Sequence, residues 1–147
     1  MPKADVTQVS KEQLRALSAF RHSLRRFLRF SEDAARSAGI TMLQYQLLLH
    51  IAGAPDRDWV SVGELAELLQ ARPNGVVALV SRCEANGLVR RKPGTLDRRQ
   101  VEVHLLAKGR KVLDKLAVLH FEELQQLAQA VEAARADPRM RVMTARA

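Results

Sequence analysis

The sequence is poor in cysteine and in aromatic residues. Cys83 is the only cysteine among 147 residues, so no disulfide can form within the chain and the cysteine pattern of a zinc site is missing. A lone thiol is typical of a reducing compartment, and we expect the protein to be cytoplasmic. Aromatic residues make up only 4% of the chain, so a hydrophobic core has to be built from leucine, valine and alanine.

Long apolar runs are also missing. No stretch approaches the ~18 apolar residues that a membrane-spanning helix needs, and no apolar run follows the first charged residues, so we expect neither a span nor a signal peptide. The chain has no glycine-rich phosphate-binding loop and no nucleophile with a base at a telling spacing, and we expect no enzymatic activity. Its four histidines are scattered, so we expect no metal and no other cofactor.

Positive charge, by contrast, is abundant and concentrated. The net charge is +8, and the segment from Arg72 to Lys111 has ten basic and three acidic residues, so it carries +7 of this excess. Such a charge favours a polyanionic partner, either nucleic acid or an acidic membrane surface. The 47% content of hydrophobic residues predicts a folded domain and not a disordered chain.

Apolar residues at three- and four-residue intervals predict five helices. The predicted ranges are 11–38, 42–52, 62–69, 73–86 and 107–136. Thr41 and Ser61 are expected N-caps, and Ser61 with Glu64 matches a capping box. The inward faces expected for the three short helices are Leu43, Leu47, Leu48 and Ile51, then Leu65, Ala66, Leu68 and Leu69, then Val76, Leu79, Val80 and Cys83.

Two short alternating runs predict a β-hairpin after the fourth helix. The runs are Leu88–Lys92 and Val101–Leu105, and Pro93-Gly94 supplies a turn between them. Trp59-Val60 is an expected third, brief strand. The predicted fold class is therefore mainly α, a winged helix-turn-helix in the order α-α-β-α-α-β-β-α, with long helices at both ends.

The fourth helix and the hairpin carry the residues expected to contact duplex DNA. The outward face of the helix consists of Arg72, Asn74, Gly75, Val77, Ala78, Ser81 and Arg82. Donors on Arg72 and Asn74 suit base edges in the major groove, Val77 or Ala78 suits a thymine methyl group, and Arg82 suits a phosphate.

The predicted hairpin tip holds Asp97, Arg98 and Arg99. Arginines at such a tip suit the electronegative minor groove, and we expect Asp97 to brace a neighbouring guanidinium. The basic residues of the first hairpin strand, Arg90, Arg91 and Lys92, are expected to steady the duplex backbone.

These motifs resemble the MarR (multiple antibiotic resistance regulator) family. The resemblance rests on Gly87-Leu88-Val89, Asp97-Arg98-Arg99, Val103-His104-Leu105 and Gly109, together with Gly39-Ile40-Thr41, Gln44 and Leu65-Ala66. It implies one domain over 11–136, in which 11–38 and 107–136 are dimerisation helices and 41–106 is the DNA-binding module. The flanking residues, 1–10 and 137–147, are expected to be a flexible arm and tail.

The resemblance also implies a function. It describes a homodimer that binds a palindromic double-stranded operator, usually represses genes, and releases DNA on binding a small aromatic effector, an oxidant or a metal. From helix faces alone, Phe20, Arg21, Tyr45 and His50 are candidates to line an effector cleft. Cys83 is interpreted as a small core residue, with a peroxide-sensing thiol as the alternative.

Three departures from the family pattern stand out. The start of the fourth helix, Asn74–Ala78, has few hydrogen-bond donors. Leu106 stands where the family usually has a threonine that caps the last helix. Only 137–147 follow the last helix, so the dimer interface is expected to be smaller or differently built. An alternative function is a protein-interaction module that has lost specific DNA binding. A third is membrane-surface binding through Arg21, Arg25, Arg26 and Arg29, although the apolar side of that helix favours a dimer, and we expect no membrane partner.

Overall fold

The computed structural model describes residues 9–138, and these fall into two units. One unit is Ser31–His120, and the other combines the described residues before 31 with those after 120. Two long helices, α1 (Lys11–Ser37) and α5 (Ala107–Ala136), each contribute to both units. The predicted arm and tail lie almost wholly outside the described residues.

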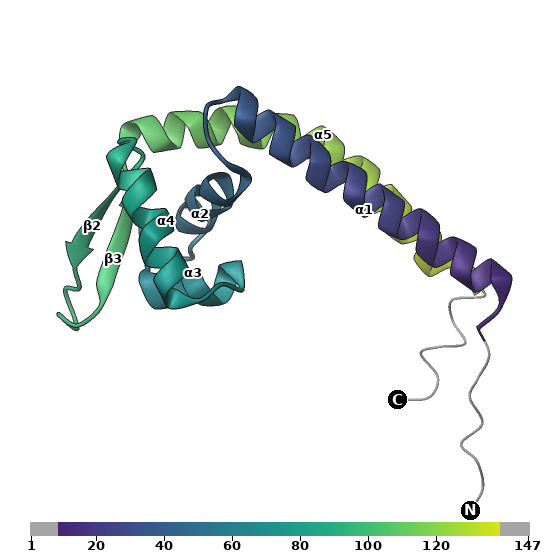
Figure 1. Ribbon diagram of the computed structural model, residues 1–147, viewed down its shortest axis with the longest axis horizontal. Coiled ribbons are helices and arrows are strands. Elements are labelled where there is room, and N and C mark those ends of the chain that lie inside the picture. The colour runs from purple at the N-terminus through teal and green to yellow at the C-terminus, as the bar shows by residue number, and fades with distance from the viewer. Residues whose placement is uncertain (1–8, 139–147) are drawn as a thin grey trace, which may run out of the picture. The chain divides into compact units, whose positions relative to one another are not determined.

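The unit Ser31–His120 is a winged helix-turn-helix (Figure 1). Between the two long helices the chain forms α2 (Met42–Ala52), β1 (Trp59–Ser61), α3 (Val62–Leu69), α4 (Pro73–Ala85), β2 (Val89–Pro93) and β3 (Val101–Leu105). The strands form one antiparallel sheet in the order β1-β3-β2, with Val60 opposite Val103 and Arg91 opposite Val103 on its other side. The predicted fold class is confirmed, with the first hairpin strand shifted by one residue.

Local capping fixes where the short helices begin. The Thr41 hydroxyl accepts a hydrogen bond from the Gln44 amide at 3.1 Å, and the Gln44 side chain accepts one from the Thr41 amide at 2.9 Å. Ser61 and Glu64 form the same reciprocal box at the start of α3. Each box satisfies two amides that a helix start leaves without partners, so the predicted caps are confirmed.

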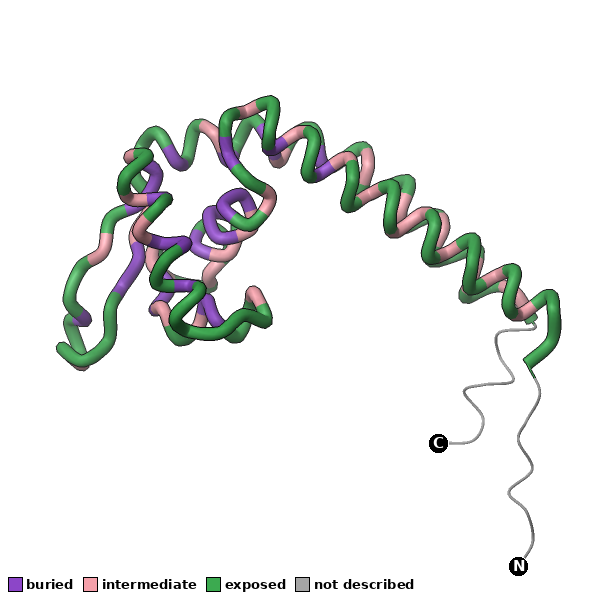
Figure 2. Tube along the Cα trace, in the orientation of Figure 1, coloured by how far each residue is buried: buried purple, intermediate pink, exposed green. Residues whose placement is uncertain are grey.

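The core of this unit is built from aliphatic side chains, as the scarcity of aromatic residues requires. Leu47, Leu48, Ile51, Leu65 and Val80 are fully buried, and Figure 2 shows the buried positions following the inner sides of the short helices and the sheet.

Two of the residues expected to face inward do not. Leu43 is 48% exposed and Leu68 is 50% exposed. On α2 the buried residues include Gln44 and Tyr45, whereas Leu43 lies outside the buried face. On α3 the core contacts Leu65 and Ala66, and Leu68 lies at the edge of that face. Helical periodicity predicts which side of a helix is apolar, but the packing partner determines how many residues of that side are buried.

The last helix begins in direct contact with the hairpin. The Leu106 amide donates to the Leu88 carbonyl at 3.0 Å, and one turn into α5 the backbone of Gly109 passes so close that a Cβ atom there would overlap the same carbonyl. Only glycine allows this approach. The contact fixes the position of β2 on the first turn of α5.

A buried histidine joins three helices within the same unit. His120 is 7% exposed, its Nδ1 lies 2.7 Å from the Leu116 carbonyl and its Nε2 lies 2.9 Å from the Ser31 hydroxyl. A carbonyl can only accept, so Nδ1 carries a proton and donates to the Leu116 carbonyl, while Nε2 shares a hydrogen bond with the Ser31 hydroxyl. The Tyr45 ring stacks on the imidazole at 4.6 Å. The contact therefore links α1, α2 and α5.

The second unit consists of α1 up to residue 30 and α5 from residue 121, which lie side by side (Figure 1). No described residue of this unit is buried. Leu14, Leu17, Phe121 and Leu124 are between 40% and 63% exposed. A helix pair with so much apolar surface in water gains little from its own packing. A search of residues 9–138 for a helix with the length and hydropathy of a membrane span finds none.

Two glycines at the third position of their helices provide a matched test of the contact between α5 and the hairpin. In Gly109→Ala the new Cβ meets the Leu88 carbonyl, so we expect destabilisation by at least ~1 kcal/mol. In Gly75→Ala on α4 the Cβ meets nothing within 4 Å, so we expect no loss and a gain of up to ~1 kcal/mol from the lower entropy of the unfolded chain. Urea denaturation of both variants measures the difference, and equal stabilities would contradict the assigned contact.

Candidate nucleic-acid interface

Helix α4 presents a buried side and an exposed side. Val76, Leu79, Val80 and Cys83 are buried, as expected. The predicted DNA-facing residues lie on the other side. Arg72, Asn74, Gly75, Val77, Ala78 and Arg82 are exposed and Ser81 is half-buried.

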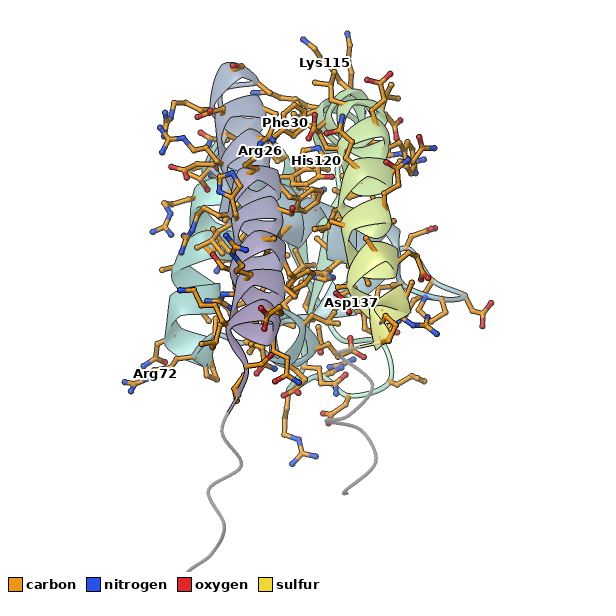
Figure 3. All side chains as sticks on the ribbon, turned by 90° about the vertical axis from the view of Figure 1, so that its right-hand side faces the viewer. Arg26, Phe30, Arg72, Lys115, His120 and Asp137 are labelled. Atoms are coloured by element: carbon orange, nitrogen blue, oxygen red, sulfur yellow. The ribbon has the colours of Figure 1, made fainter. Side chains whose placement is uncertain are left out.

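The start of α4 carries two polar groups beside an apolar surface. Arg72 is the N-cap residue, but its side chain makes no capping hydrogen bond, and Figure 3 shows it pointing away from the ribbon. Pro73 occupies the first turn, as predicted. Val77 is 44% exposed and Gly75 faces open space. The side chains of Arg72 and Asn74 are therefore the exposed donors with which this first turn can read a base edge.

The hairpin tip is organised by an ion pair between close neighbours. Asp97 Oδ1 accepts from the Arg99 amide at 3.0 Å and from Arg99 Nε at 3.2 Å. These hydrogen bonds, the backbone one first, lower the pKa of Asp97. Asp97 thus pairs with a neighbouring guanidinium, as expected, and that guanidinium belongs to Arg99. The Arg99 side chain stays 92% exposed, so its guanidinium is held without being covered.

The backbone of the tip closes on itself through Gly94. Its amide donates to the Gln100 carbonyl at 2.9 Å, and a Cβ at this position would overlap the Asp97 carbonyl. Behind the turn, Glu102 is 3% exposed and accepts from the Thr95 amide at 3.1 Å. Glu102 also lies 3.3 Å from the His104 ring. Glu102 is a positioning residue that sequence patterns do not reveal, because its partners are set by the hairpin register.

A second ion pair attaches the hairpin to α4. Glu84 on α4 accepts from the Arg91 amide at 2.8 Å and from Arg91 Nη2 at 3.1 Å. The sequence predicts the same contact with the duplex backbone for Arg90, Arg91 and Lys92, yet the structure distinguishes them. Arg91 is half-buried and bound to α4, whereas Arg90 and Lys92 are exposed. The pair sets the angle between the hairpin and the helix.

Comparisons with known proteins agree with this geometry. Residues 38–100 match the model of the MarR family. The match spans the segment from just before α2 into the hairpin turn, and over this segment the chain is similar to the MarR family. A sequence comparison with curated proteins finds no match.

Several solved structures share the fold of this chain. AbsC, a MarR family transcriptional regulator from Streptomyces coelicolor, is 20% identical with a TM-score of 0.72, covering 83% of this chain and 82% of AbsC. A mutant of MarR from E. coli complexed with operator DNA is 19% identical with a TM-score of 0.64, covering 84% and 86%. YusO from Bacillus subtilis is 20% identical with a TM-score of 0.63, covering 86% and 99%.

The thiol of Cys83 is part of the core of the winged unit. Cys83 has no exposed surface, and burial raises its pKa to about 11, against a smaller opposite effect of Arg82. A thiol with that pKa is protonated at neutral pH and is a poor nucleophile. The interpretation of Cys83 as a core residue is confirmed.

The four candidate effector residues lie in different surroundings. Phe20 lines a hollow between α1 and α5 in the helical unit, and Arg21 is exposed on α1. Tyr45 is buried against His120, and burial raises its pKa. His50 lines a hollow beside α3 in the winged unit. Among residues 9–138 no cluster of three or more His, Cys, Asp or Glu side chains is placed to hold a metal ion.

The Glu84–Arg91 pair has a pH signature. Hydrogen bonds from the Arg91 amide and then from its side chain lower the pKa of Glu84 below the ordinary 4.5. A lowered pKa in the folded state stabilises the fold above pH 4.5, and this contribution is lost as the pH falls through the folded-state value. We therefore expect Glu84→Gln to lower stability at pH 7, with the difference from the unaltered protein shrinking below pH 4.5.

Chemical denaturation across pH 3–8 measures this difference, and hydrogen exchange at the Arg91 amide reports the lost contact directly. Glu122→Gln, which removes an exposed carboxylate from α5, controls for the change in net charge. A stability loss that persists undiminished to pH 3 would show that the carboxylate charge is not the stabilising element.

Proposed function

We propose that this protein is a transcriptional regulator that binds double-stranded DNA as a homodimer, with one winged helix-turn-helix per protomer on each half of a palindromic operator. One observation carries the proposal. The exposed start of α4 and the hairpin tip, where Asp97 holds Arg99, belong to the same structural unit. The operator-bound E. coli MarR and the regulator AbsC, both of the same fold, support it.

The two parts of the interface are suited to different tasks. Arg72 and Asn74 project from the first turn of α4, the part of a recognition helix that meets base edges. Arg98 and Arg99 sit on a narrow tip, where a guanidinium gains from the negative potential of a minor groove. Asp97 adds a negative charge near phosphates, but it holds the Arg99 guanidinium in one orientation. The exposed Arg90 and Lys92 then face the phosphate backbone.

The homodimer is proposed from the helical unit. Leu14, Leu17 and Leu28 are exposed along α1, and Phe121 and Leu124 are exposed on α5. A second copy that covers these side chains would remove them from water at about 25 cal/mol per Å² of apolar surface. The two half-sites of the operator are then expected about one helical turn of DNA apart.

We further propose, on the family resemblance, that the protein is a repressor that releases DNA when a small aromatic effector binds. The candidates Phe20, Arg21, Tyr45 and His50 do not form one site in the structure: Phe20 lines a hollow of the helical unit, and His50 lines a separate hollow of the winged unit. The alternative function, a protein-interaction module, is favoured by one feature: the exposed surface of Gly75, Val77 and Ala78 offers no side-chain donors.

Arginine variants test the division of labour. We expect Arg98→Ala and Arg99→Ala to weaken binding on all duplexes and each to lower the slope of log K against log salt by roughly 1. Arg72→Ala and Asn74→Ala should instead change sequence preference, by about 1–3 kcal/mol at one base pair each. Fluorescence anisotropy with a selected operator and its single-base variants measures both effects.

Arg135→Ala removes an exposed arginine of α5 and is the charge-matched control, which should leave binding unchanged. Equal loss on every sequence for all four variants would contradict the separate roles. Failure of the unaltered protein to bind any duplex at low salt would contradict DNA binding itself and favour the interaction module.

The dimer has its own test. We expect sedimentation equilibrium to give twice the mass of one chain at micromolar concentration, and Leu17→Glu combined with Leu124→Glu to shift the protein toward monomers, because two charges would be buried without partners. Leu96→Glu, at a fully exposed leucine of the hairpin tip, is the control. A monomeric unaltered protein would contradict the proposal, as would an equal shift in the control.

A further inference from the structure

A hollow of about 530 Å³ lies within the winged unit, away from the exposed face of α4. The end of α2, the loop 53–58, β1 and α3 surround it. Its aliphatic lining consists of Leu49, Ala54, Pro55, Val60 and Leu68. This volume falls within the ~300–1,000 Å³ range of small-molecule sites.

Two of the lining leucines are exposed to water without any covering element. Leu49 is 41% exposed and Leu68 is 50% exposed. The exposure of Leu68, which periodicity placed in the core, is thus explained by its position on the wall of the hollow. A small molecule can fill a concave site and cover its apolar walls, whereas the flat surface of a partner protein cannot enter it.

The charged groups of the hollow are already paired with each other. Arg57 Nη2 lies 2.7 Å from Glu64 Oε1, and the Arg57 guanidinium also lies 4.7 Å from the centre of the Trp59 ring. Burial acts to raise the pKa of Glu64, but hydrogen bonds from Arg57 and Ser61 outweigh it and lower the pKa, so the carboxylate stays charged. Arg57 is therefore committed to Glu64 and is not free for an anionic ligand.

The remaining polar groups also disfavour an anion. Burial lowers the pKa of His50, so its ring is neutral at pH 7. Glu67 adds a second carboxylate to the lining, so Arg57, Glu64 and Glu67 together give a net charge of −1. Within the described chain the His50 ring makes no hydrogen bond, and its two nitrogens are left as a donor and an acceptor for a bound group.

We propose that this hollow is a binding site for a neutral, largely apolar small molecule that carries one hydroxyl group. The apolar body lies between Leu49 and Leu68, and the hydroxyl group meets the His50 imidazole. A carboxylate of the same shape is excluded by the net negative lining. Binding at this site stands independently of DNA binding, whereas a role as effector site rests on the proposed function.

The experiment uses two probes that share one apolar body, 4-tert-butylcyclohexanol and 4-tert-butylcyclohexanecarboxylate, with the full chain at pH 7. Isothermal titration calorimetry measures binding. Trp59, the only tryptophan, reports its location because Arg57 contacts both its ring and the hollow. We expect saturable binding of the alcohol with a change in Trp59 emission, and binding of the carboxylate at least tenfold weaker.

Paired leucine variants place the site. Leu68→Gln, at an exposed wall position, should weaken alcohol binding at least tenfold. Leu43→Gln, on α2 and comparably exposed but not part of the lining, should leave it unchanged. Circular dichroism verifies that both variants fold. The proposal is overturned if the alcohol fails to bind up to its solubility limit, if the carboxylate binds as tightly, or if both variants lose binding equally. No DNA is present, so these outcomes are separate from the test of the regulator.

Discussion

The position of Leu88 is the constraint on which the interface depends. Its amide donates to the Cys83 carbonyl at the end of α4, its carbonyl accepts from Leu106 and lies against Gly109 at the start of α5, and its side chain is 1% exposed. Leu88 thus connects α4, the hairpin and α5 through close backbone contacts. The Glu84–Arg91 pair adds a second attachment between helix and wing. These contacts hold the strand that leads to the arginine tip against α4 and the start of α5.

The two units differ in how far they are stabilised by their own residues. The winged unit has a continuous core and capped helices, and His120 ties Ser31 to Leu116 and stacks on Tyr45 within it. The helical unit has no buried residue in its described part. Two helices with partly exposed leucines are marginal in water. A partner that covers Leu14, Leu17 and Leu124 would supply the missing burial, and this physical need supports a dimer independently of any family resemblance.

Features set by neighbours along the chain could be predicted from the sequence. The capping boxes of Thr41 and Ser61, Pro73 at the start of α4 and the Asp97–Arg99 contact depend on residues no more than three positions apart. Features set by tertiary packing could not. Ser31 and His120 are 89 positions apart, the Glu84–Arg91 contact needs the angle between wing and helix, and the exposure of Leu43 and Leu68 depends on which part of each helix the core covers. Periodicity identifies the apolar face of a helix, and tertiary packing decides which residues at the edge of that face are buried.

The composition of the interface has a consequence for recognition. Charge is plentiful on the wing, but the start of α4 offers Arg72 and Asn74 beside a donor-poor surface that includes Val77. Phosphate and minor-groove contacts contribute affinity with little sequence information, whereas base-edge donors contribute specificity. A protomer with so few donors would discriminate weakly by itself. Under the proposed function, discrimination would then come from methyl contacts of Val77 and Ala78 and from the spacing that a homodimer imposes on two half-sites. In the proposed homodimer, dimerisation would therefore contribute to selectivity as well as to stability.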